Sequence, residues 1–517
     1  AYYGGGSFGG TLNNCTISGN SASKGGGLYY GTLNNCILSG NSAKKGGNES
    51  YYGGGGAYYG TLNNCTLTGN SAPDGGGSEY GTLNNCTLSG NSAGRGGGSF
   101  ASTLNNCTLT GNSAFNGGGS MGGTLNNCTL SGNSASKDGG GSSYNTLNNC
   151  TLTGNSASDS GGGSEAGTLN NCTLTWNTAS TNGGGSSGGT LNNCIVYYNT
   201  AVLGPNYADS TFNYSCTIPA PGGTGNITSE PGLASATHLS AGSPCIGQGS
   251  SAYTSGTDID GEAWRSPPSM GCDEVVVGSI TGVLSVGAWV DYTNVAVGFP
   301  VQFRADITGH ATASSWQWGD GAVTSNQPYA THAFASGGIY DVVLTAYNES
   351  HPLGVAATVT VQVAMQTVHY VNISNATPVS PFSSWATAAT NIQDAIDVAA
   401  QGGAMVLVTN GVYATGGRVV RGSIYGYMTN RVAINKPLTV QSVNGPDMTI
   451  IQGAWHPGTT NGNSAVRCVY VGNNSVLSGF MLTNGATQTD ANGGGAFCES
   501  SGVISNCILS GNSAYYG

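Results

Sequence analysis

The fold is decided by the stretch Thr82-Leu-Asn-Asn-Cys-Thr-Leu-Ser-Gly-Asn-Ser-Ala93, which a glycine triplet, Gly96 to Gly98, follows closely. Its opening motif, Thr-Leu-Asn-Asn-Cys-(Thr/Ile)-(Leu/Ile/Val), recurs nine times between Thr11 and Val196, with a period of 21 to 22 residues. A fixed period of this length indicates a stack of equivalent structural units.

The spacing of the cysteines gives the length of each repeat. Successive copies lie 21 or 22 residues apart, except between Cys36 and Cys65, where eight extra residues around Gly46-Gly-Asn-Glu-Ser-Tyr-Tyr52 are expected to loop out. The ten marker cysteines are Cys15, Cys36, Cys65, Cys86, Cys107, Cys128, Cys150, Cys172, Cys194 and Cys216.

The units are predicted to be β-structure. Apolar residues at helical spacing are almost absent, whereas small and aliphatic residues such as Leu12, Cys15, Ile17 and Ala22 recur once per unit between polar ones. A unit of this size holds three short strands and three turns, which is one rung of a parallel β-helix. Ten rungs at about 4.8 Å each give a rod roughly 45 Å long.

Stacking predicts columns of identical side chains. One amide ladder is expected at Asn14, Asn35, Asn64 and Asn85, and a second at Asn20, Asn41, Asn70 and Asn91. Asn-Cys-Thr also reads as a glycosylation acceptor, so modified asparagine is the alternative for the first column. The triplet Gly25 to Gly27 fits a corner that needs positive φ or close backbone approach.

The cysteine column is interpreted as buried free thiols. Copies in register have poor disulfide geometry, the count of fifteen is odd, and no Cys/His cluster has metal spacing. The prediction is therefore that the thiols pack as small hydrophobic groups and are mostly reduced.

Beyond Cys216 the repeat ends, and a closing segment is expected over 217–274, completing a first domain at 1–274. It contains four motifs: Ile227-Thr-Ser-Glu-Pro231, Ala241-Gly-Ser-Pro-Cys-Ile-Gly-Gln248, Thr257-Asp-Ile-Asp-Gly-Glu262 and Met270-Gly-Cys-Asp-Glu274. This segment resembles the end of bacterial right-handed parallel β-helix surface proteins, pectin-lyase-like and with a choice-of-anchor ending. Asp258, Asp260 and Glu262 supply oxygen ligands for Ca²⁺, but too few of them, and a solvated turn is favoured.

Residues 275–364 change to long alternating strands, as in a β-sandwich. The motifs Trp316-Gln-Trp-Gly-Asp-Gly321, Thr331-His-Ala-Phe334 and Gly338-Ile-Tyr-Asp-Val-Val-Leu-Thr345 resemble those of a PKD domain. That resemblance implies a spacer or interaction module of a secreted bacterial protein. Trp316 and Trp318 are expected in its core, with sugar stacking as the alternative.

Residues 365–517 resemble the N-terminal part of the same β-helix family. An amphipathic capping helix is predicted over 384–401, and strands over 404–408, 438–442, 448–452 and 476–480. The rung then reappears as Ile504-Ser-Asn-Cys-Ile-Leu-Ser-Gly-Asn-Ser-Ala514.

The β-helix parts follow the usual order, from cap to closing segment, only when the end of the sequence is joined to its start. Cys507 and Cys15 are 25 residues apart across the two ends, or 21 when Ala514-Tyr-Tyr-Gly517 and Ala1-Tyr-Tyr-Gly4 are counted once. The same tetrapeptide also occurs at 57–60, so coincidence is the alternative. The expectation is a unit of about 513 residues that continues into a neighbouring copy, in tandem or head to tail.

The composition limits the partners. A net charge of −11 with only 7% charged residues excludes a typical nucleic-acid-binding surface, and no apolar run is long enough for membrane insertion. The predicted partners are other copies of the chain, with surface glycans as the second candidate.

Three functions compete. The favoured one is an extracellular structural rod or filament on or outside a bacterial cell. The second is an adhesin or glycan-binding surface protein, whose candidate residues are Tyr29, Tyr30, Tyr51, Tyr52, Tyr58 and Tyr59. Tyrosine is also simply a good strand residue.

The third function is a polysaccharide lyase or hydrolase, which requires paired carboxylates. The acids of the rungs are Glu49, Asp74, Glu79, Asp138, Asp159, Glu165 and Asp209. No pair of rungs is expected to offer two carboxylates at matching positions. The sequence therefore predicts no enzyme, no catalytic or metal site and no cofactor.

Overall fold

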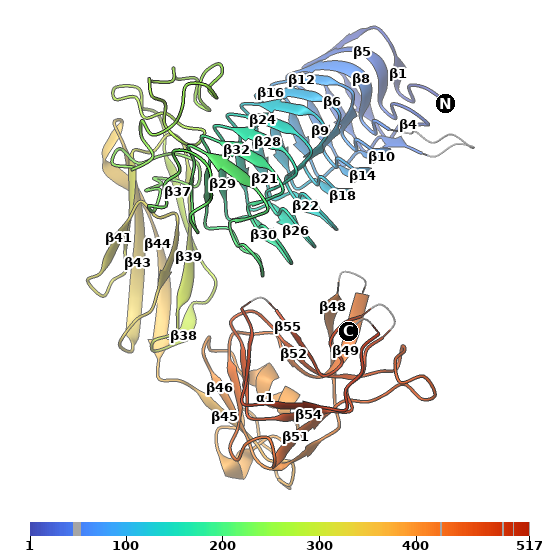
Figure 1. Cartoon of the computed structure of the whole chain (residues 1–517), viewed down its shortest axis with the longest axis vertical. Helices are drawn as coiled ribbons and strands as arrows, with labels where there is room; N and C mark the ends of the chain where they lie inside the picture. The colour runs from blue at the N-terminus through green and yellow to red at the C-terminus, as the bar shows by residue number, and fades with distance from the viewer. Residues whose placement is uncertain (45–52, 424–425, 489–490, 500, 516–517) are drawn as a thin grey trace.

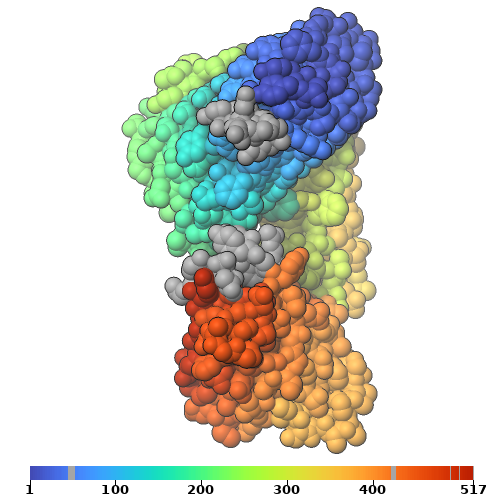
Figure 2. All heavy atoms as spheres, turned by 90° about the vertical axis from the view of Figure 1, so that its right-hand side faces the viewer, coloured from blue at the N-terminus to red at the C-terminus, as the bar shows by residue number. Residues whose placement is uncertain are grey.

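The structure is a computed structural model that describes residues 1–44, 53–423, 426–488, 491–499 and 501–515 (Figure 1). It is all-β, with a first β-helix segment (residues 1–216), a closing segment (217–274), a β-sandwich and a second β-helix segment (365–515). Figure 2 shows the first rungs at one end of the elongated molecule and the second segment at the other. The predicted fold class is confirmed.

A single rung explains the first segment. The fourth rung consists of β11 (Ser78–Glu79), β12 (Thr82–Asn84), β13 (Thr87–Ser89) and β14 (Ser92–Arg95). Each strand pairs in parallel with its copies one period away, which gives sheets of 18, 10 and 8 strands. The rung therefore has three faces, of which the first carries two short strands.

The first rung has the same layout, with β1 (Ser7–Phe8), β2 (Thr11–Asn13), β3 (Thr16–Ser18) and β4 (Ser21–Ala22). The core consists of the predicted columns. Leu83, Cys86 and Leu88 are buried like their copies in neighbouring rungs, whereas Leu12 and Cys15 of the first rung are only partly covered. The predicted register of the core is confirmed.

The glycine triplet forms a tight corner. Gly25 has a φ of +65°. A Cβ on Gly26 would lie 2.4 Å from the carbonyl oxygen of Ser42 and 2.5 Å from that of Gly55. No side chain fits there, so the corner needs both the positive φ and the absence of a Cβ.

The cysteine column is as predicted from Cys15 to Cys194, but its last member is wrong by one residue. Cys216 does not continue the cysteine column, because β33 (Ile195–Tyr197) and β36 (Cys216–Thr217) pair Ile195 with Cys216 and so place Ser215 beside Cys194. The cause is a 21-residue spacing where 22 was assumed.

In the rungs named for it, the first asparagine ladder is made by Asn13 and its copies rather than by Asn14. The amide of Asn34 donates to Oδ1 of Asn13 at 2.7 Å, whereas Asn14 turns the backbone with a φ of 54°. Later copies of Asn14 do bond in pairs, since the amide of Asn149 donates to Asn127 at 3.1 Å and that of Asn193 to Asn171 at 3.2 Å. The second ladder is as predicted, since the amide of Asn20 donates to Oδ1 of Asn41 at 3.0 Å.

All fifteen cysteines are free thiols. In the column, the backbone N–H of Cys86 donates to Sγ of Cys107 at 3.4 Å, and that thiol donates to the carbonyl of Leu83 at 3.5 Å. The sulfur atoms therefore take part in the hydrogen bonding between rungs. The insertion at 46–52 lies outside the described residues.

The middle domain is a two-sheet sandwich. One sheet contains β37 (Ser285–Val290), β39 (Val301–Thr308) and β42 (Tyr329–His332); the other contains β38 (Asn294–Ala296), β44 (His351–Ala364), β43 (Gly338–Asn348), β40 (Ala313–Gln317) and β41 (Val323–Ser325). Trp316 and Trp318 are buried between them with parallel rings 5.5 Å apart. They are core residues, as predicted.

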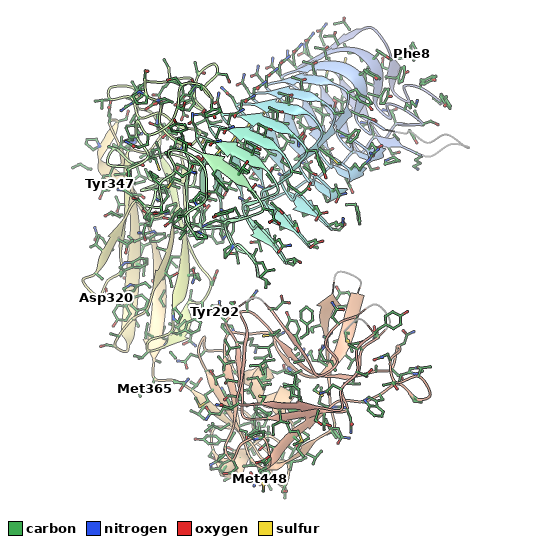
Figure 3. The ribbon with its side chains drawn as sticks, viewed as in Figure 1. Phe8, Tyr292, Asp320, Tyr347, Met365 and Met448 are labelled. Carbon is green, nitrogen blue, oxygen red and sulfur yellow. The ribbon has the colours of Figure 1, made fainter. Side chains whose placement is uncertain are left out.

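The second β-helix segment begins after Met365, which Figure 3 labels beside the sandwich. It has three sheets. The first contains β45 (Val368–Val371), β46 (Met405–Val408), β50 (Thr439–Ser442), β53 (Val476–Ser478) and β56 (Val503–Ser505), and the second contains β47 (Gly411–Tyr413), β51 (Thr449–Gln452), β54 (Met481–Thr483) and β57 (Ile508–Ser510). The third contains β48 (Arg418–Ser423), β49 (Gly426–Ile434), β52 (Arg467–Val471) and β55 (Ala496–Cys498).

The capping helix is shorter than the predicted 384–401. Only α1 (Ile392–Val398) is α-helical, with Asn391 as its N-cap, and a single 3-10 turn covers Trp385–Thr387. Ala389 forms a β-bridge with Val371, so the backbone before Asn391 is extended. None of the helices in the described parts of the chain has the length and apolarity needed to cross a membrane.

Candidate functional site

An exposed aromatic surface covers the first rungs, where two columns follow the glycine corner. The outer column stacks Tyr30 on Tyr59 with ring centroids 5.0 Å apart, and Tyr59 on Tyr80 at the same distance, at interplanar angles of 9° and 16°. Their exposed fractions are 46%, 41% and 40%. The "tyrosine surface" comprises Phe8, Tyr29, Tyr30, Tyr58, Tyr59, Tyr80 and Phe100, of which Tyr58 is buried beneath the others.

The backbone fixes the direction of the outer column. Tyr30, Tyr59 and Tyr80 have φ values of 56°, 54° and 52°, a left-handed conformation that a bulky residue seldom adopts. Each ring packs against the copy in the next rung, and this packing offsets the cost of the strained backbone. The result is a ridge of parallel rings at a spacing set by the rungs.

The inner column supports this ridge. Tyr29 stacks on Tyr58 at 5.4 Å and 7°, and Phe8, labelled at the outer end of the stack in Figure 3, stacks on Tyr29 at 5.3 Å. Burial raises the pKa of Tyr29, Tyr58 and Tyr80, so the phenols stay neutral. A neutral aromatic surface with hydroxyl groups suits the apolar faces and hydroxyls of a sugar.

A buried carboxyl lies under this surface. Glu79 is only 4% exposed, and burial raises its pKa to about 8, with nearby Asp74 adding to the effect. Asp74 is held by Arg95, whose Nε and Nη2 each donate to it at 2.7 Å. Glu79 is therefore neutral at moderately acid pH and faces a carboxylate already engaged in an ion pair.

Further along the stack, Glu165 and Asp138 form a similar pair, since burial and, to a lesser extent, nearby Asp138 raise the pKa of Glu165. Lys137 forms an ion pair with Asp138 at 3.0 Å, and the hydroxyl of Ser143 donates to Glu165 at 2.7 Å. The prediction that no two rungs match is wrong in two cases, since pairing between rungs places Glu79 and Glu165 in one column and Asp74 and Asp138 in another. The members of these columns lie four and three rungs apart, roughly 19 and 14 Å, too far to act on one bond.

Other predicted residues lie elsewhere. Tyr51, Tyr52 and Glu49 fall outside the described residues. Asp258 is not solvated as expected, because it is buried and its carboxylate accepts the N–H groups of Asp260, Glu262 and Glu274. The loop needs that carboxylate to satisfy its own backbone amides.

Sequence reasoning missed the contact between the first β-helix segment and the sandwich. Trp176 and Tyr198 occupy the column that glycine fills in earlier rungs, with φ values of 56° and 58°. Tyr329 of the sandwich stacks on Trp176 at 5.8 Å, and the guanidinium of Arg304 lies 4.3 Å from the Trp176 ring centroid. The sequence signal for this contact was that Trp176 and Tyr198 replace the glycine that precedes asparagine in the earlier rungs.

The first and last rungs that the structure describes, 1–24 and 493–514, have equivalent backbones. The rung at 493–514 repeats the backbone of the first rung, with Gly493, Asn506 and Gly511 at φ values of 64°, 49° and 63°, against 57°, 54° and 68° for Gly4, Asn14 and Gly19. Its strand β57 is exposed along its whole length, and Leu509 is 54% exposed. The copies of Leu509 inside the stack are fully buried.

Comparison with known proteins identifies one part of the chain. Among curated proteins none matches it. Among solved structures, it is similar to a mutant tailspike protein of E. coli bacteriophage HK620 in complex with a pentasaccharide, with 11% identity, 68% of this chain and 74% of that chain covered, and a TM-score of 0.14. That similarity carries no argument about function. Residues 290–363 match the PKD domain family, so the sandwich is a PKD domain set between two β-helix segments.

Proposed function

We propose that the chain is an extracellular structural protein whose β-helix continues from one unit to the next, head to tail, as a rod or filament. The observation that supports this most directly is the equivalence of the outermost rungs, 493–514 and 1–24. The PKD domain, a module typical of extracellular proteins, supports the location outside the cell.

The two edges are complementary in hydrogen bonding. Between regular rungs, the amide of Asn41 donates to the carbonyl of Ile17 at 2.8 Å, and its backbone N–H donates to Oδ1 of Asn70 at 2.9 Å. The amide of Asn512 makes the first of these bonds with Leu482 at 2.8 Å. The second bond would run from the backbone N–H of Asn512 to Oδ1 of Asn20 in an adjoining unit, whether in the same polypeptide or in another copy.

The edges are also complementary in apolar surface. Stacking 493–514 below 1–24 would cover Leu509 with Ile17, and Ile504 with Leu12, as in every pair of neighbouring rungs. Unpaired strand edges with apolar side chains are templates for further strands. A contact between different surfaces of two copies does not close on itself and propagates as a filament.

The experiment is sedimentation velocity and negative-stain electron microscopy of the purified chain over a range of concentrations. The expected result is head-to-tail species that grow with concentration, and Leu509→Asp should abolish them. Ile339→Asp is the matched control, because Ile339 is an exposed aliphatic residue of β43 in the PKD domain. A chain that stays monomeric throughout, or assembly that Leu509→Asp leaves intact, contradicts the proposal.

A second candidate is a glycan-binding surface protein, which the tyrosine surface favours. Its experiment is binding of the chain to an array of neutral and acidic oligosaccharides. Tyr59→Ala should weaken binding, because it interrupts the outer column at its centre, whereas exposed Tyr427 gives the control Tyr427→Ala. Equal binding by Tyr59→Ala and the unmodified chain would exclude this surface.

We propose no catalytic activity and no nucleic-acid partner. Among the described rungs, Asp74 is held by Arg95 and Glu79 is buried in the interior, while Asp138 pairs with Lys137 and Glu165 accepts the hydroxyl of Ser143. The net charge of −11 disfavours a phosphate backbone.

A further inference from the structure

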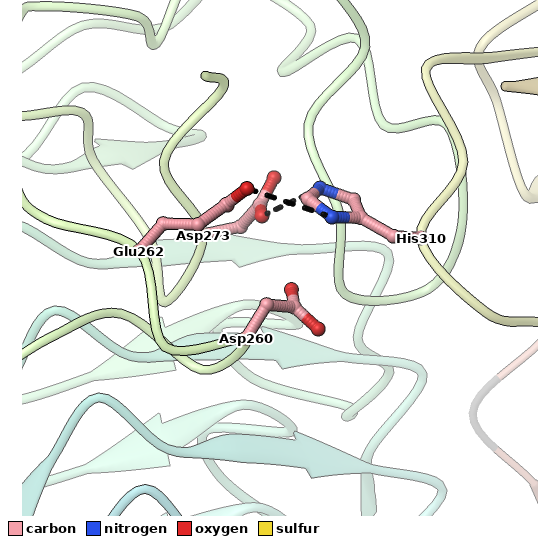
Figure 4. Close-up of side chains that lie close together, drawn as sticks. All are labelled: Asp260, Glu262, Asp273 and His310. Atoms are coloured by element: carbon pink, nitrogen blue, oxygen red, sulfur yellow. Dashed lines mark ion pairs between the residues drawn. The ribbon is translucent and has the colours of Figure 1, made fainter. Parts of the chain in front are cut away.

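Four side chains with metal-binding atoms meet where the closing segment touches the PKD domain. Asp260, Glu262 and Asp273 come from the closing segment, and His310 comes from the loop between β39 and β40. One ligand atom of each lies within 4.8 Å of all the others. Figure 4 shows Glu262, Asp273 and His310 pointing toward one another, with Asp260 beside them.

Polar atoms at the centre of this group are buried without a hydrogen bond. Asp273 is fully buried, and its Oδ2 accepts the N–H of Leu239 at 2.7 Å, but its Oδ1 accepts no hydrogen bond. Oε2 of Glu262 and Nε2 of His310 are also buried without a hydrogen-bond partner in the described structure. Leaving such atoms unpaired is costly, so their convergence points to a ligand between them.

The nearby groups that could satisfy these atoms are already engaged. Arg265 forms an ion pair with Glu274 at 2.6 Å, and His238 forms one with Asp260 at 3.0 Å. His310 alone faces the remaining carboxylates, with Nε2 3.5 Å from Asp273 and Nδ1 4.0 Å from Glu262. The His238 ring lies 5.0 Å from that of His310, but its Nε2 is held by Asp260, so two carboxylates and the His310 imidazole share the remaining space.

We infer that Asp260, Glu262, Asp273 and His310 form a binding site for a divalent transition-metal ion, Zn²⁺ in the first place. Imidazole and carboxylate together suit Zn²⁺, whereas Ca²⁺ takes six to eight oxygen ligands, more than this site offers. Ligand atoms about 2.1 Å from a tetrahedral ion lie about 3.5 Å from one another, close to the observed spacing. His238 orients Asp260 from outside the ligand set.

The proposed ion would have a structural role. Four protein ligands complete a tetrahedral shell and leave no open position for a substrate. Because three ligands belong to the closing segment and one to the PKD domain, the ion fastens the sandwich to the end of the first β-helix segment.

The test is titration of the full chain with ZnCl₂ by calorimetry and thermal unfolding, in a Cys498→Ser background that removes the exposed thiol. The expected result is one ion per chain and a Tm that rises with zinc. His310→Gln and Asp273→Asn should each weaken binding at least about tenfold. Glu262→Gln, at a less buried position, should do the same without endangering the fold. Asp320→Asn is the control, since Asp320 pairs with His332 at 2.7 Å on the PKD surface.

CoCl₂ in place of zinc should give the visible absorption of a tetrahedral site without a sulfur-to-cobalt charge-transfer band. The inference is overturned if the chain binds no zinc, or if the folded variants bind it unchanged. It is also overturned if cobalt shows thiolate ligation, or if CaCl₂ binds in a way that His310→Gln does not affect.

Discussion

The two neighbouring asparagines of the first rung have different roles. Asn13 ends a strand and joins the outer amide ladder, whereas Asn14 adopts a left-handed backbone that turns the chain toward the next face. Asparagine tolerates both positions, so the sequence alone could not show which of the two residues forms the ladder. The serine that replaces cysteine at 215 was missed for a similar reason, because Cys216 stood at an acceptable spacing.

Glu79 should make the stability of the first β-helix segment depend on pH. Burial raises its pKa from 4.5 to about 8, so the folded state holds a proton that the unfolded state has already lost. The contribution to stability is fully present below pH 4.5, falls as the pH rises, and is lost above about 8. Glu79→Gln should remove this dependence and exceed the unmodified chain in stability by at most about 5 kcal/mol at pH 9. Urea unfolding at several pH values measures it, and parallel pH profiles would contradict it.

The cysteine column should tolerate serine better than alanine. Ser215 already accepts the N–H of Cys194 at 2.9 Å, as Cys107 accepts that of Cys86. Cys107→Ala leaves a buried N–H without a partner and should cost about 1 to 3 kcal/mol, whereas Cys107→Ser should cost less. Chemical unfolding of the two variants compares them. A serine variant less stable than the alanine variant would show that side-chain volume and polarity, rather than hydrogen bonding to the N–H, determine the stability of the column.

At the scale of elements, the two asparagine ladders should contribute unequally to the free energy of unfolding. Asn112 is buried; its amide donates to Leu88 and Asn133, and its Oδ1 accepts the N–H of Asn91. Asn112→Ala should therefore destabilise the segment by about 2 to 4 kcal/mol. Asn105→Ala, in the half-buried outer ladder, is the matched variant and should cost under about 1 kcal/mol. Thermal unfolding gives both values, and equal losses would refute the distinction.

The sequence predicted the rung, its three faces and its core because strand periodicity and stacking repeat the same choice many times. It overestimated the helix at 384–401 because the apolar spacing continues through residues that instead form a bridge between Ala389 and Val371. Pairing with a distant strand overrides local helical preference.

At the scale of the whole molecule, long-range contacts set the position of the PKD domain. His310 is 48 residues beyond Glu262, and no spacing in the sequence relates the two. The close approach of Asp260, Glu262, Asp273 and His310 depends on how two domains pack, which explains why only a turn was predicted there. The aromatic column at Tyr30 and Tyr59, by contrast, follows from the repeat itself.

Trp176→Gly should separate domain packing from rung stability. It restores the residue that the column uses elsewhere and relieves a φ of 56°, so the β-helix should lose little or no stability. It also removes the ring that contacts Tyr329 and Arg304, so the PKD domain should become less firmly held. Thermal unfolding and small-angle X-ray scattering test the two effects. An unchanged scattering profile, or a strongly lowered Tm, would contradict this assignment.

The near identity of the rungs has a consequence for how such a protein changes length. Every regular rung offers its neighbours the same leucine, cysteine and asparagine contacts, so inserting or deleting a whole period leaves each interface as it was. Recombination between copies of the coding repeat would then alter reach in steps of about 4.8 Å without a new folding problem. The irregular rungs at Trp176 and Tyr198 cannot be exchanged in this way, and they fix where along the rod the PKD domain sits.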